Sequence, residues 1–306
     1  MEHPNRRAVI DCGTNTFHLL IADIVDGGLQ EVYRERRFVK LATDGIEKIG
    51  PAPFARGLDA LTHYADVLRE HNCLQVTAFG TAALRTASNG PEFVEVAAKK
   101  TGVQITLIPG DEEARLITKG VLAALPAIPE RVLIMDIGGG STEFILAQGN
   151  DVYWRRSFPI GVSVLKNEFH KNDPITYEEI VALQGHLQQV TKPLVAVLSQ
   201  RNTQHLVGAA GTFDVLANVL RDESAQKHPT SQRLQLAGLA ELHQTVIHST
   251  MEERLAFPGL PPERADMIVV AMVLIDFVIQ LAGVNKITVS DYAMKEGILL
   301  EQAAGG

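Results

Sequence analysis

The same short pattern occurs twice in this chain of 306 residues. Residues 132–143 (VLIMDIGGGSTE) place four apolar residues before an aspartate, three glycines and two hydroxyl side chains. Residues 8–23 (AVIDCGTNTFHLLIAD) repeat the plan of apolar strand, Asp-x-Gly, small polar turn and apolar strand. Each copy predicts two strands joined by a tight turn. A repeated supersecondary unit predicts two similar domains.

Both turns have the composition of an anion-binding site, because glycine lets backbone N–H groups approach a phosphate closely. A single Asp-x-Gly turn fits an ordinary hairpin equally well. Two copies favour a pair of phosphate turns facing one interdomain cleft, with a chain of phosphates held between them. The residues expected to form this cradle are Gly13, Thr14 and Asn15 in the first turn and Gly138, Gly139, Gly140 and Ser141 in the second.

Carboxylates accompany both turns. Asp136 and Glu143 flank the second turn, and Asp11 precedes the first. Carboxylate oxygens are the donors that Mg²⁺ prefers. We therefore expect Asp136 and Glu143 to hold Mg²⁺, directly or through water, with Asp11 contributing from the opposite domain.

Composition excludes several functional classes. A net charge of −8 argues against non-specific nucleic-acid binding, which needs a basic surface. The longest apolar run, residues 267–282, is too short to span a bilayer and contains Asp276. The charged residues before the first strand leave no room for the apolar core of a signal peptide, so we expect none. Cys12 and Cys73 are expected to be buried, reduced thiols. We expect a cytoplasmic protein without a membrane partner.

The first half of the chain has the pattern of an α/β layer in which three strands precede alternating helices and strands. Expected strands and helices follow in the order strand 8–12, strand 17–25, strand 29–40, helix 54–71, strand 74–80, short helix 81–89, helix 91–102, strand 103–108 and a helix from 109.

The second half repeats this order after a proline-rich linker at 125–130. We expect domains at 1–124 and 125–306, with the terminal helix near 293–306 packing back onto the first. Pro193 should interrupt the helix that starts at Tyr177, and residues 221–232 should form a mobile loop. The remaining expected elements are strands 131–137, 142–148, 152–158 and 286–290, helices 161–169, 237–249 and 262–282, and a strand, glycine turn and helix from 204.

Taken together, the motifs resemble the exopolyphosphatase / guanosine pentaphosphate phosphohydrolase (Ppx/GppA) family. That family belongs to the actin, sugar-kinase and Hsp70 superfamily, so the resemblance implies two ribonuclease-H-like (actin-like ATPase) domains. It also implies a Mg²⁺-dependent hydrolase that releases orthophosphate from polyphosphate, guanosine pentaphosphate, or both. The resemblance is carried by residues 8–19, 81–89, 110–117, 134–143, 208–212 and 289–297.

Two charged side chains acquire catalytic roles through this resemblance. Arg85 lies on a short helix and could bind a phosphate bidentately, although its position alone also fits a surface charge. Glu112 and Glu113 open a helix, where acids also compensate the helix dipole. The resemblance implies that Arg85 contacts phosphate and that Glu113, the second acid of Gly-x-Glu-Glu-Ala, is the general base, with Glu112 in support.

Other features remain open at the sequence level. Gly211 and Thr212 could contact a guanosine, a distal phosphate, or only their own helix. The pair Arg155 and Arg156 could line the cleft or be an exposed hairpin pair. Lys295 stands where many relatives have arginine, which leaves a bidentate contact there undecided.

Two other functions share these motifs. A kinase of the same superfamily would need an acceptor pocket, and the Gly-x-Glu-Glu-Ala motif argues against it. A sensor would bind guanosine tetra- or pentaphosphate without turnover. The sequence contains no Walker A motif, and it distinguishes neither the physiological substrate nor the preferred chain length. The apolar C-terminal half is compatible with a homodimer.

Overall fold

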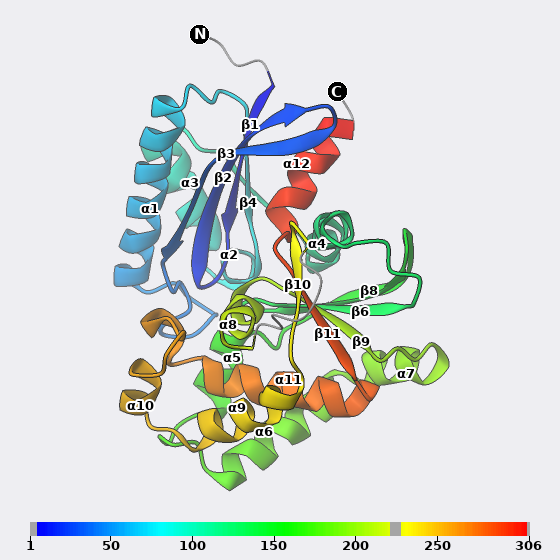
Figure 1. Cartoon of the computed structure of the whole chain (residues 1–306). Coiled ribbons are helices and arrows are strands. Elements are labelled where there is room, and N and C mark those ends of the chain that lie inside the picture. Colours follow the sequence, from blue (N-terminus) through cyan, green and yellow to red (C-terminus); the bar gives the residue numbers. More distant parts are fainter. Residues whose placement is uncertain (1–4, 221–227, 305–306) are drawn as a thin grey trace. The chain divides into compact units, whose positions relative to one another are not determined.

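A computed structural model describes residues 5–220 and 228–304 (Figure 1). The chain divides into two units, one formed by Met1–Gly120 with Met294–Gly306, the other by Val121–Ala293. The division falls inside helix α4 (Gly110–Ala124), ahead of the 125–130 stretch. The expected mobility of 221–232 concerns mainly residues 221–227, which lie outside the described residues.

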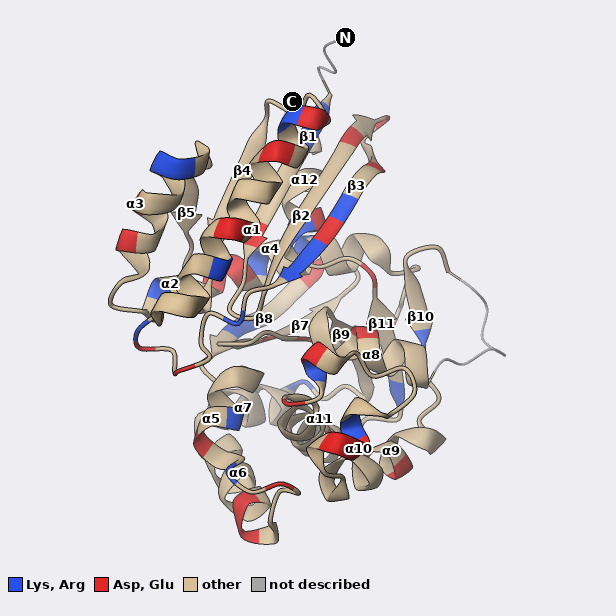
Figure 2. Cartoon of the chain, turned by 90° about the vertical axis from the view of Figure 1, so that its left-hand side faces the viewer, with Lys and Arg blue, Asp and Glu red and all other residues tan. Residues whose placement is uncertain are grey.

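The first unit contains a five-stranded sheet in the order β3-β2-β1-β4-β5. Its first three strands form an antiparallel meander, and the last two run parallel to β1. Opposite charges alternate along the outer strand β3 (Figure 2). The strands are β1 (Arg6–Cys12), β2 (Thr16–Val25), β3 (Gly28–Phe38), β4 (Val76–Gly80) and β5 (Ile105–Leu107).

Helices cover both faces of this sheet. Ala8, Ile10 and Cys12 face the apolar core that lies beneath α1 (Pro51–Glu70) and α3 (Gly90–Thr101). Because neighbouring residues of a strand point to opposite faces, Asp11 points to the other side. There α12 (Met294–Ala304) packs against β1, β2 and β3 (Figure 1).

Helix α12 packs closely against α4 and forms an ion pair with it. A Cβ atom on Gly297 would lie 2.0 Å from the carbonyl oxygen of Leu116, so only glycine fits at this crossing. Arg115 of α4 donates to both carboxylate oxygens of Glu301, at 2.7 and 3.0 Å. The last helix of the chain is therefore an integral part of the first unit.

The second unit repeats the plan with one addition. Its sheet has the order β10-β11-β9-β6-β7-β8, in which β6, β7 and β8 form the antiparallel meander and β9 and β11 run parallel to β6. The expected α/β class with two ribonuclease-H-like units is thereby confirmed. The strands are β6 (Val132–Ile137), β7 (Thr142–Gln148), β8 (Asp151–Phe158), β9 (His205–Ala209), β10 (Ser231–Arg233) and β11 (Lys286–Ser290).

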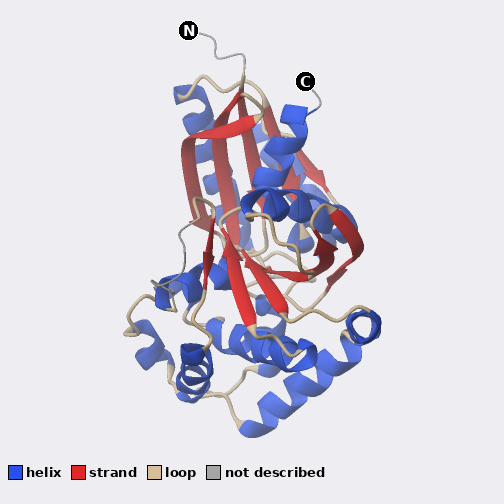
Figure 3. Cartoon of the chain, turned by 45° about the vertical axis from the view of Figure 1, so that its right-hand side comes forward, coloured by secondary structure: helices blue, strands red, loops and turns tan. Residues whose placement is uncertain are grey.

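Most helices of this unit gather against one face of its sheet (Figure 3). The central one is α11, which is apolar except at Asp276 and Gln280 and contacts α5, α6 and α9. A helix that is apolar over most of its surface is stable only when it is largely buried. The helices are α5 (Val162–Phe169), α6 (Tyr177–Val190), α7 (Lys192–Gln200), α8 (Gly211–Val219), α9 (Ala237–His248), α10 (Met251–Leu255) and α11 (Ile268–Ala282).

Two expectations for this unit were wrong in detail. The helix expected over 262–282 is a short 3-10 turn at Pro262–Arg264 followed by α11, which begins at Ile268. The carbonyl of Ala265 accepts a hydrogen bond from Arg254 Nε at 2.8 Å, so that carbonyl serves a tertiary contact between the two segments. Strand β10 falls in a stretch expected to be a loop, because its pairing comes from β11 and not from its own polar sequence.

Three smaller expectations are also resolved. Helix α6 ends at Val190 and α7 begins at Lys192, so the break expected near Pro193 is present. Cys12 and Cys73 are buried and form no disulfide. Within residues 5–220 and 228–304, no helix is long and apolar enough to cross a membrane.

Candidate active site

The turn between β1 and β2 is closed by a hydrogen bond from Gly13 N to the carbonyl of Thr16, at 3.1 Å. A Cβ atom at Gly13 would lie 2.8 Å from the same oxygen, so the turn requires glycine. The hydroxyl of Thr14 accepts from Ala83 N at 3.2 Å and ties the turn to α2 (Ala82–Thr86). Thr14 therefore places the turn beside the short helix that carries Arg85.

The turn between β6 and β7 has the same closing bond, from Gly138 N to the carbonyl of Ser141, at 3.0 Å. The carbonyls of Gly138 and Gly139 accept from Val162 N and Ser163 N of α5, at 3.0 and 2.8 Å. With its carbonyls held by a helix N-terminus, the turn keeps a fixed conformation. The repeat seen in the sequence is thus a repeat of backbone geometry.

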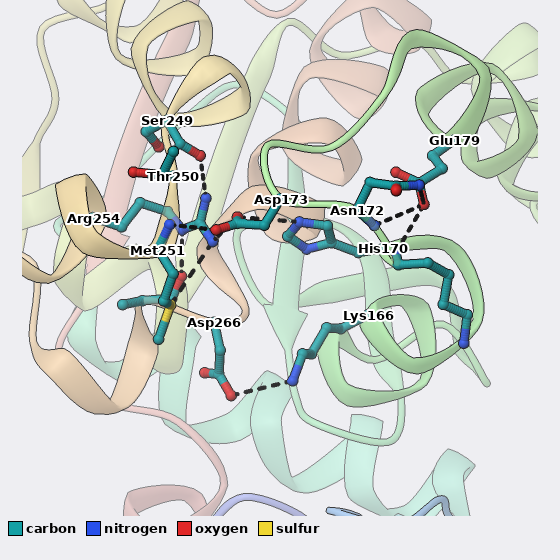
Figure 4. A network of polar contacts seen from close by, with 12 residues as sticks. Lys166, His170, Asn172, Asp173, Glu179, Ser249, Thr250, Met251, Arg254 and Asp266 are labelled. Atoms are coloured by element: carbon teal, nitrogen blue, oxygen red, sulfur yellow. Dashed lines mark hydrogen bonds and ion pairs between the residues drawn. The ribbon is translucent and has the colours of Figure 1, made fainter.

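Helix α5 is in turn anchored by a polar network (Figure 4). Lys166 of α5 lies 3.5 Å from Asp266. Beyond the end of α5, Asp173 accepts from Arg254 Nη2 and from Met251 N, both at 2.6 Å. Arg254 is buried, and a buried arginine is stable only when its charge is paired. The network joins the segment after α5 to the residues of α10. It thereby helps to fix α5, whose first N–H groups bind the glycine turn.

Asp136 and Glu143 are direct partners on the β6–β7 ladder. Opposite residues of an antiparallel pair share a face of the sheet, with Cβ atoms about 5 Å apart. Both side chains are buried, and Glu143 Oε1 accepts a hydrogen bond from the Ser157 hydroxyl at 2.6 Å. The structure therefore brings these two predicted ligands together in the second unit.

The corresponding ladder partners in the first unit are Asp11 and His18. Asp11 Oδ1 is buried and accepts no hydrogen bond from any described residue. Burial raises the pKa of Asp11 to about 6, with Lys295 lowering it and Glu296 raising it. A carboxylate left without donors in this way has the capacity to bind a cation.

A metal site made by three side chains is not present in the described part of the chain. No group of three or more His, Cys, Asp or Glu residues there is arranged to hold a metal ion. The pair Asp136 and Glu143 fits Mg²⁺ nonetheless, because Mg²⁺ usually keeps several waters and takes only one or two carboxylates from the protein. Asp11 belongs to the other unit.

Arg85 and Glu113 lie together in the first unit. Arg85 Nη1 donates to the carbonyl of Ile108 at 2.6 Å and lies 3.4 Å from Glu113 Oε2. Glu113 is 9% exposed and sits in the first turn of α4, where its N–H donates to Pro109. Burial and an adjacent cation distinguish this glutamate from an ordinary helix-start acid.

Its neighbour Glu112 has a different environment. Both oxygens of Glu112 accept from Arg115, at 2.7 and 2.8 Å, and Arg115 continues to Glu301 of α12. Glu112 therefore belongs to the α4–α12 contact, and Glu113 belongs to the Arg85 pair.

The turn before α8 lies at the end of β6. Ala210 and Gly211 have consecutive positive φ angles, 55° and 49°. A Cβ atom at Gly211 would lie 3.0 Å from the carbonyl of Ile137 and 3.3 Å from Arg264 Nη1. The predicted residues Gly211 and Thr212 are thus next to the strand that carries Asp136.

Arg264 is a residue that the sequence patterns did not identify. It is buried, at 9% exposure, and its guanidinium lies beside the Gly211 turn. The one feature of the sequence that could have identified it is an arginine at the start of a long, mainly apolar segment. Because a helix was expected over 262–282, this arginine was not singled out. The second unit thus supplies a buried cation near its glycine turns.

Known proteins resemble this chain over nearly its whole length. The model of the Ppx/GppA phosphatase family matches residues 20–304. Exopolyphosphatase 2 of Mycobacterium tuberculosis is 30% identical over 315 aligned positions, which cover 97% of this chain and 98% of that protein.

Solved structures show the same similarity. The crystal structure of an exopolyphosphatase from Cytophaga hutchinsonii is 38% identical, with a TM-score of 0.93 and 98% of each chain covered. The crystal structure of the Aquifex aeolicus member of the Ppx/GppA family is 26% identical, with a TM-score of 0.79 and 98% of each chain covered.

Proposed function

This chain belongs to the Ppx/GppA phosphatase family, and we propose from that premise that it releases orthophosphate from the end of inorganic polyphosphate. The family resemblance drawn from the motifs is confirmed, and so is a hydrolase of the phosphatase type. Two similar proteins from different bacteria are named exopolyphosphatases. That name supports polyphosphate as the first substrate to test.

The observation that carries the proposal is the Arg85–Glu113 pair. A phosphoryl oxygen bound to the free edge of the Arg85 guanidinium would lie beside the Glu113 carboxylate, because the two side chains are 3.4 Å apart. Arg85 would then position the terminal phosphoryl group and stabilise its negative charge. Its bond to the Ile108 carbonyl fixes the guanidinium before substrate arrives.

Glu113 is the proposed general base. A water molecule between Glu113 and the phosphorus atom transfers a proton to the carboxylate while its oxygen forms the new P–O bond. The bond from phosphorus to the bridging oxygen breaks, and the shortened chain leaves with the electron pair. The product is orthophosphate, and Glu113 later returns the proton to solvent.

We propose that each glycine turn binds phosphate through its backbone N–H groups. Their common closing bonds, at 3.1 and 3.0 Å, support a common role. Asp136 and Glu143 would hold Mg²⁺ in the second unit, with Asp11 as the candidate ligand of the first, and Mg²⁺ when bound would neutralise charge on the phosphoryl oxygens. The orphaned Oδ1 of Asp11 and the paired carboxylates of the second unit support that cofactor.

The test is phosphate release from purified protein. Polyphosphate, guanosine pentaphosphate and ATP with a small-molecule acceptor are compared, each with Mg²⁺ and with a chelator in excess. We expect Mg²⁺-dependent release of orthophosphate from polyphosphate without an acceptor. Binding of guanosine pentaphosphate without release from any substrate would favour a sensor, and transfer that requires an acceptor would favour a kinase.

A further inference from the structure

The outer strand of the second sheet, β8, carries an unusual concentration of positive charge. We define the β8 arginine patch as Arg131, Tyr153, Arg155, Arg156 and Arg201. Arg155, Arg156, Arg201 and Tyr153 are exposed, and Arg131 is partly exposed. β8 is the edge strand of its sheet, and Figure 2 colours its arginines blue. All five residues belong to one unit.

Aromatic rings hold these arginines in place. The guanidinium carbons of Arg131 and Arg201 lie 5.4 and 4.9 Å from the centre of the Tyr153 ring. That of Arg156 lies 5.5 Å from the Phe158 ring. Contacts of this kind offset part of the repulsion between like charges. Three of the four arginines of the patch are therefore held against aromatic rings.

Its charge is not neutralised by neighbouring acids. None of the four arginines forms an ion pair with a carboxylate of the described residues, whereas Arg34, Arg115 and Arg254 all do. The chain as a whole carries a net charge of −8, so this local excess of positive charge is opposite in sign to the overall charge. Two of them at the Tyr153 ring and two more on the same edge strand indicate a site for a polyanion.

The patch begins next to the carboxylate pair of the candidate active site. Ser157 of β8 donates to Glu143, and Arg155 is two residues away on the same strand. Residues two apart share a face and lie about 6.6 Å apart along a strand. From Arg155 the patch continues along β8 to the bulge at Tyr153, where Arg131 and Arg201 converge.

We propose that the β8 arginine patch binds the distal phosphates of a polyphosphate chain that also binds at the second glycine turn. This inference rests on the proposed function and specifies how the same site selects long chains. Guanidinium groups bind phosphate oxygens in pairs. The Tyr153 ring is already covered by two guanidinium groups, which disfavours the base stacking that a nucleic acid would use.

The test measures equilibrium binding to a Glu113→Gln protein, which retains the patch and should not degrade its ligand. Ligands are triphosphate and polyphosphate of about a hundred units, titrated over a range of salt concentrations. Adding Arg131→Gln and Arg201→Gln should weaken binding of the long chain about tenfold, since each exposed contact contributes about a factor of three. The slope of log affinity against log salt should fall in magnitude by about 1.4.

Triphosphate, which is too short to reach from the second turn to Tyr153, should lose much less affinity than the long chain. The matched control is Lys171→Gln with Lys192→Gln, which removes two exposed cations from the same unit but outside the patch. Because Arg131 also donates to the Asn202 carbonyl, a second variant, Arg155→Gln with Arg201→Gln, leaves that contact intact. Circular dichroism establishes that each variant is folded.

The outcomes separate this inference from the proposed function. Equal losses for triphosphate and polyphosphate, or equal losses in the control variant, would overturn the patch assignment. Competition by single-stranded DNA as strong as that by polyphosphate would overturn it in favour of a nucleic-acid site. Length-dependent binding in a natural protein that releases no phosphate would retain the patch and contradict the proposed enzyme.

Discussion

Adjacent residues in one helical turn can have unrelated roles, as Glu112 and Glu113 show. Glu112 binds Arg115 with both oxygens, whereas Glu113 is 9% exposed and faces Arg85 at 3.4 Å. The helix dipole stabilises both carboxylates equally and cannot separate them. Their partners do, because Glu112 binds Arg115 of the same helix, which continues to Glu301 of α12, whereas Glu113 faces Arg85 of α2.

Replacing Glu113 with glutamine should reduce turnover while preserving the fold. The amide has the same shape as the carboxylate but accepts no proton, so kcat for phosphate release should fall about 10²- to 10⁴-fold. The control is Asp111→Asn, an exposed acid in the same turn that loses the same charge. Steady-state kinetics that give similar kcat values for Glu113→Gln and the natural protein would contradict the general-base assignment.

Replacing Arg85 with lysine tests whether geometry matters beyond charge. Lysine keeps the positive charge, but it cannot donate to Ile108 and to a phosphate through one planar group. We expect kcat/KM to fall about 10- to 100-fold, which corresponds to the loss of one hydrogen bond between charged groups. A lysine variant with natural kcat/KM would show that Arg85 acts only as a diffuse charge.

At the level of elements, the second glycine turn depends on a glycine outside its own motif. A Cβ atom at Gly161 would lie 2.4 Å from both the carbonyl carbon and the oxygen of Gly139. Gly161 immediately precedes α5, whose first N–H groups hold the turn. The turn and the helix start can approach only because both lack side chains at this point.

Gly161→Ala should therefore destabilise the second unit and lower phosphate release together. Overpacking against rigid backbone costs about 1–3 kcal/mol or more. The matched control is Gly185→Ala in the middle of α6, where a Cβ atom meets nothing within 4 Å. That change should stabilise the helix by about 0.5–1 kcal/mol. Urea unfolding monitored by circular dichroism gives both values, and equal stability of the two variants would refute the packing argument.

The sequence predicted those elements whose pattern is local. Both meanders, both turns and the break near Pro193 follow from periodicity, glycine and proline, and each is present. Strand β10 was missed because its stability comes from β11, which lies more than fifty residues later. The late start of α11 was missed because the Ala265 carbonyl is bound by a distant arginine.

The candidate site likewise contains residues that a local pattern predicts and residues that only tertiary contacts bring together. Asp136 and Glu143 could be paired from the strand–turn–strand pattern alone, since the turn fixes which residues face each other. The contact between Arg85 and Glu113 joins residues 28 positions apart and was not predicted, since the family resemblance implied only a separate role for each residue. The positions of Arg264 and of the two arginines at Tyr153 depend on tertiary packing, for which the sequence carries no periodic signal.

In the whole molecule, the same strand–turn–strand unit occurs twice with different side chains next to the turn. The ladder position that holds Glu143 in the second unit holds His18 in the first. The second unit therefore has two carboxylates at its turn. The first unit has one, and its turn is joined through Thr14 to α2, the helix that carries Arg85. The duplication has therefore kept the strand–turn–strand geometry while the side chains next to the turn differ.

Stability of the whole chain should decrease in mild acid because of His205. This residue is 3% exposed and bridges the strands of the second unit, with Nε2 2.9 Å from Thr288 Oγ1 and Nδ1 3.2 Å from Glu130. Burial, together with the charge of Lys286, lowers the pKa of His205 to about 4. The imidazole is therefore neutral in the folded protein over a range where the unfolded chain is protonated.

The direction of the effect follows from proton binding. Between pH 6.5, the ordinary histidine value, and pH 4, the unfolded chain binds a proton that the folded chain does not, so acid favours unfolding. Between pH 7 and pH 5 this residue alone should lower the free energy of unfolding by about 2 kcal/mol. His205→Gln retains hydrogen-bonding groups but does not titrate, so the difference between the two proteins isolates the histidine. Denaturant unfolding at both pH values should show a steeper loss in the natural protein, and parallel losses would mean that His205 is protonated in the folded state.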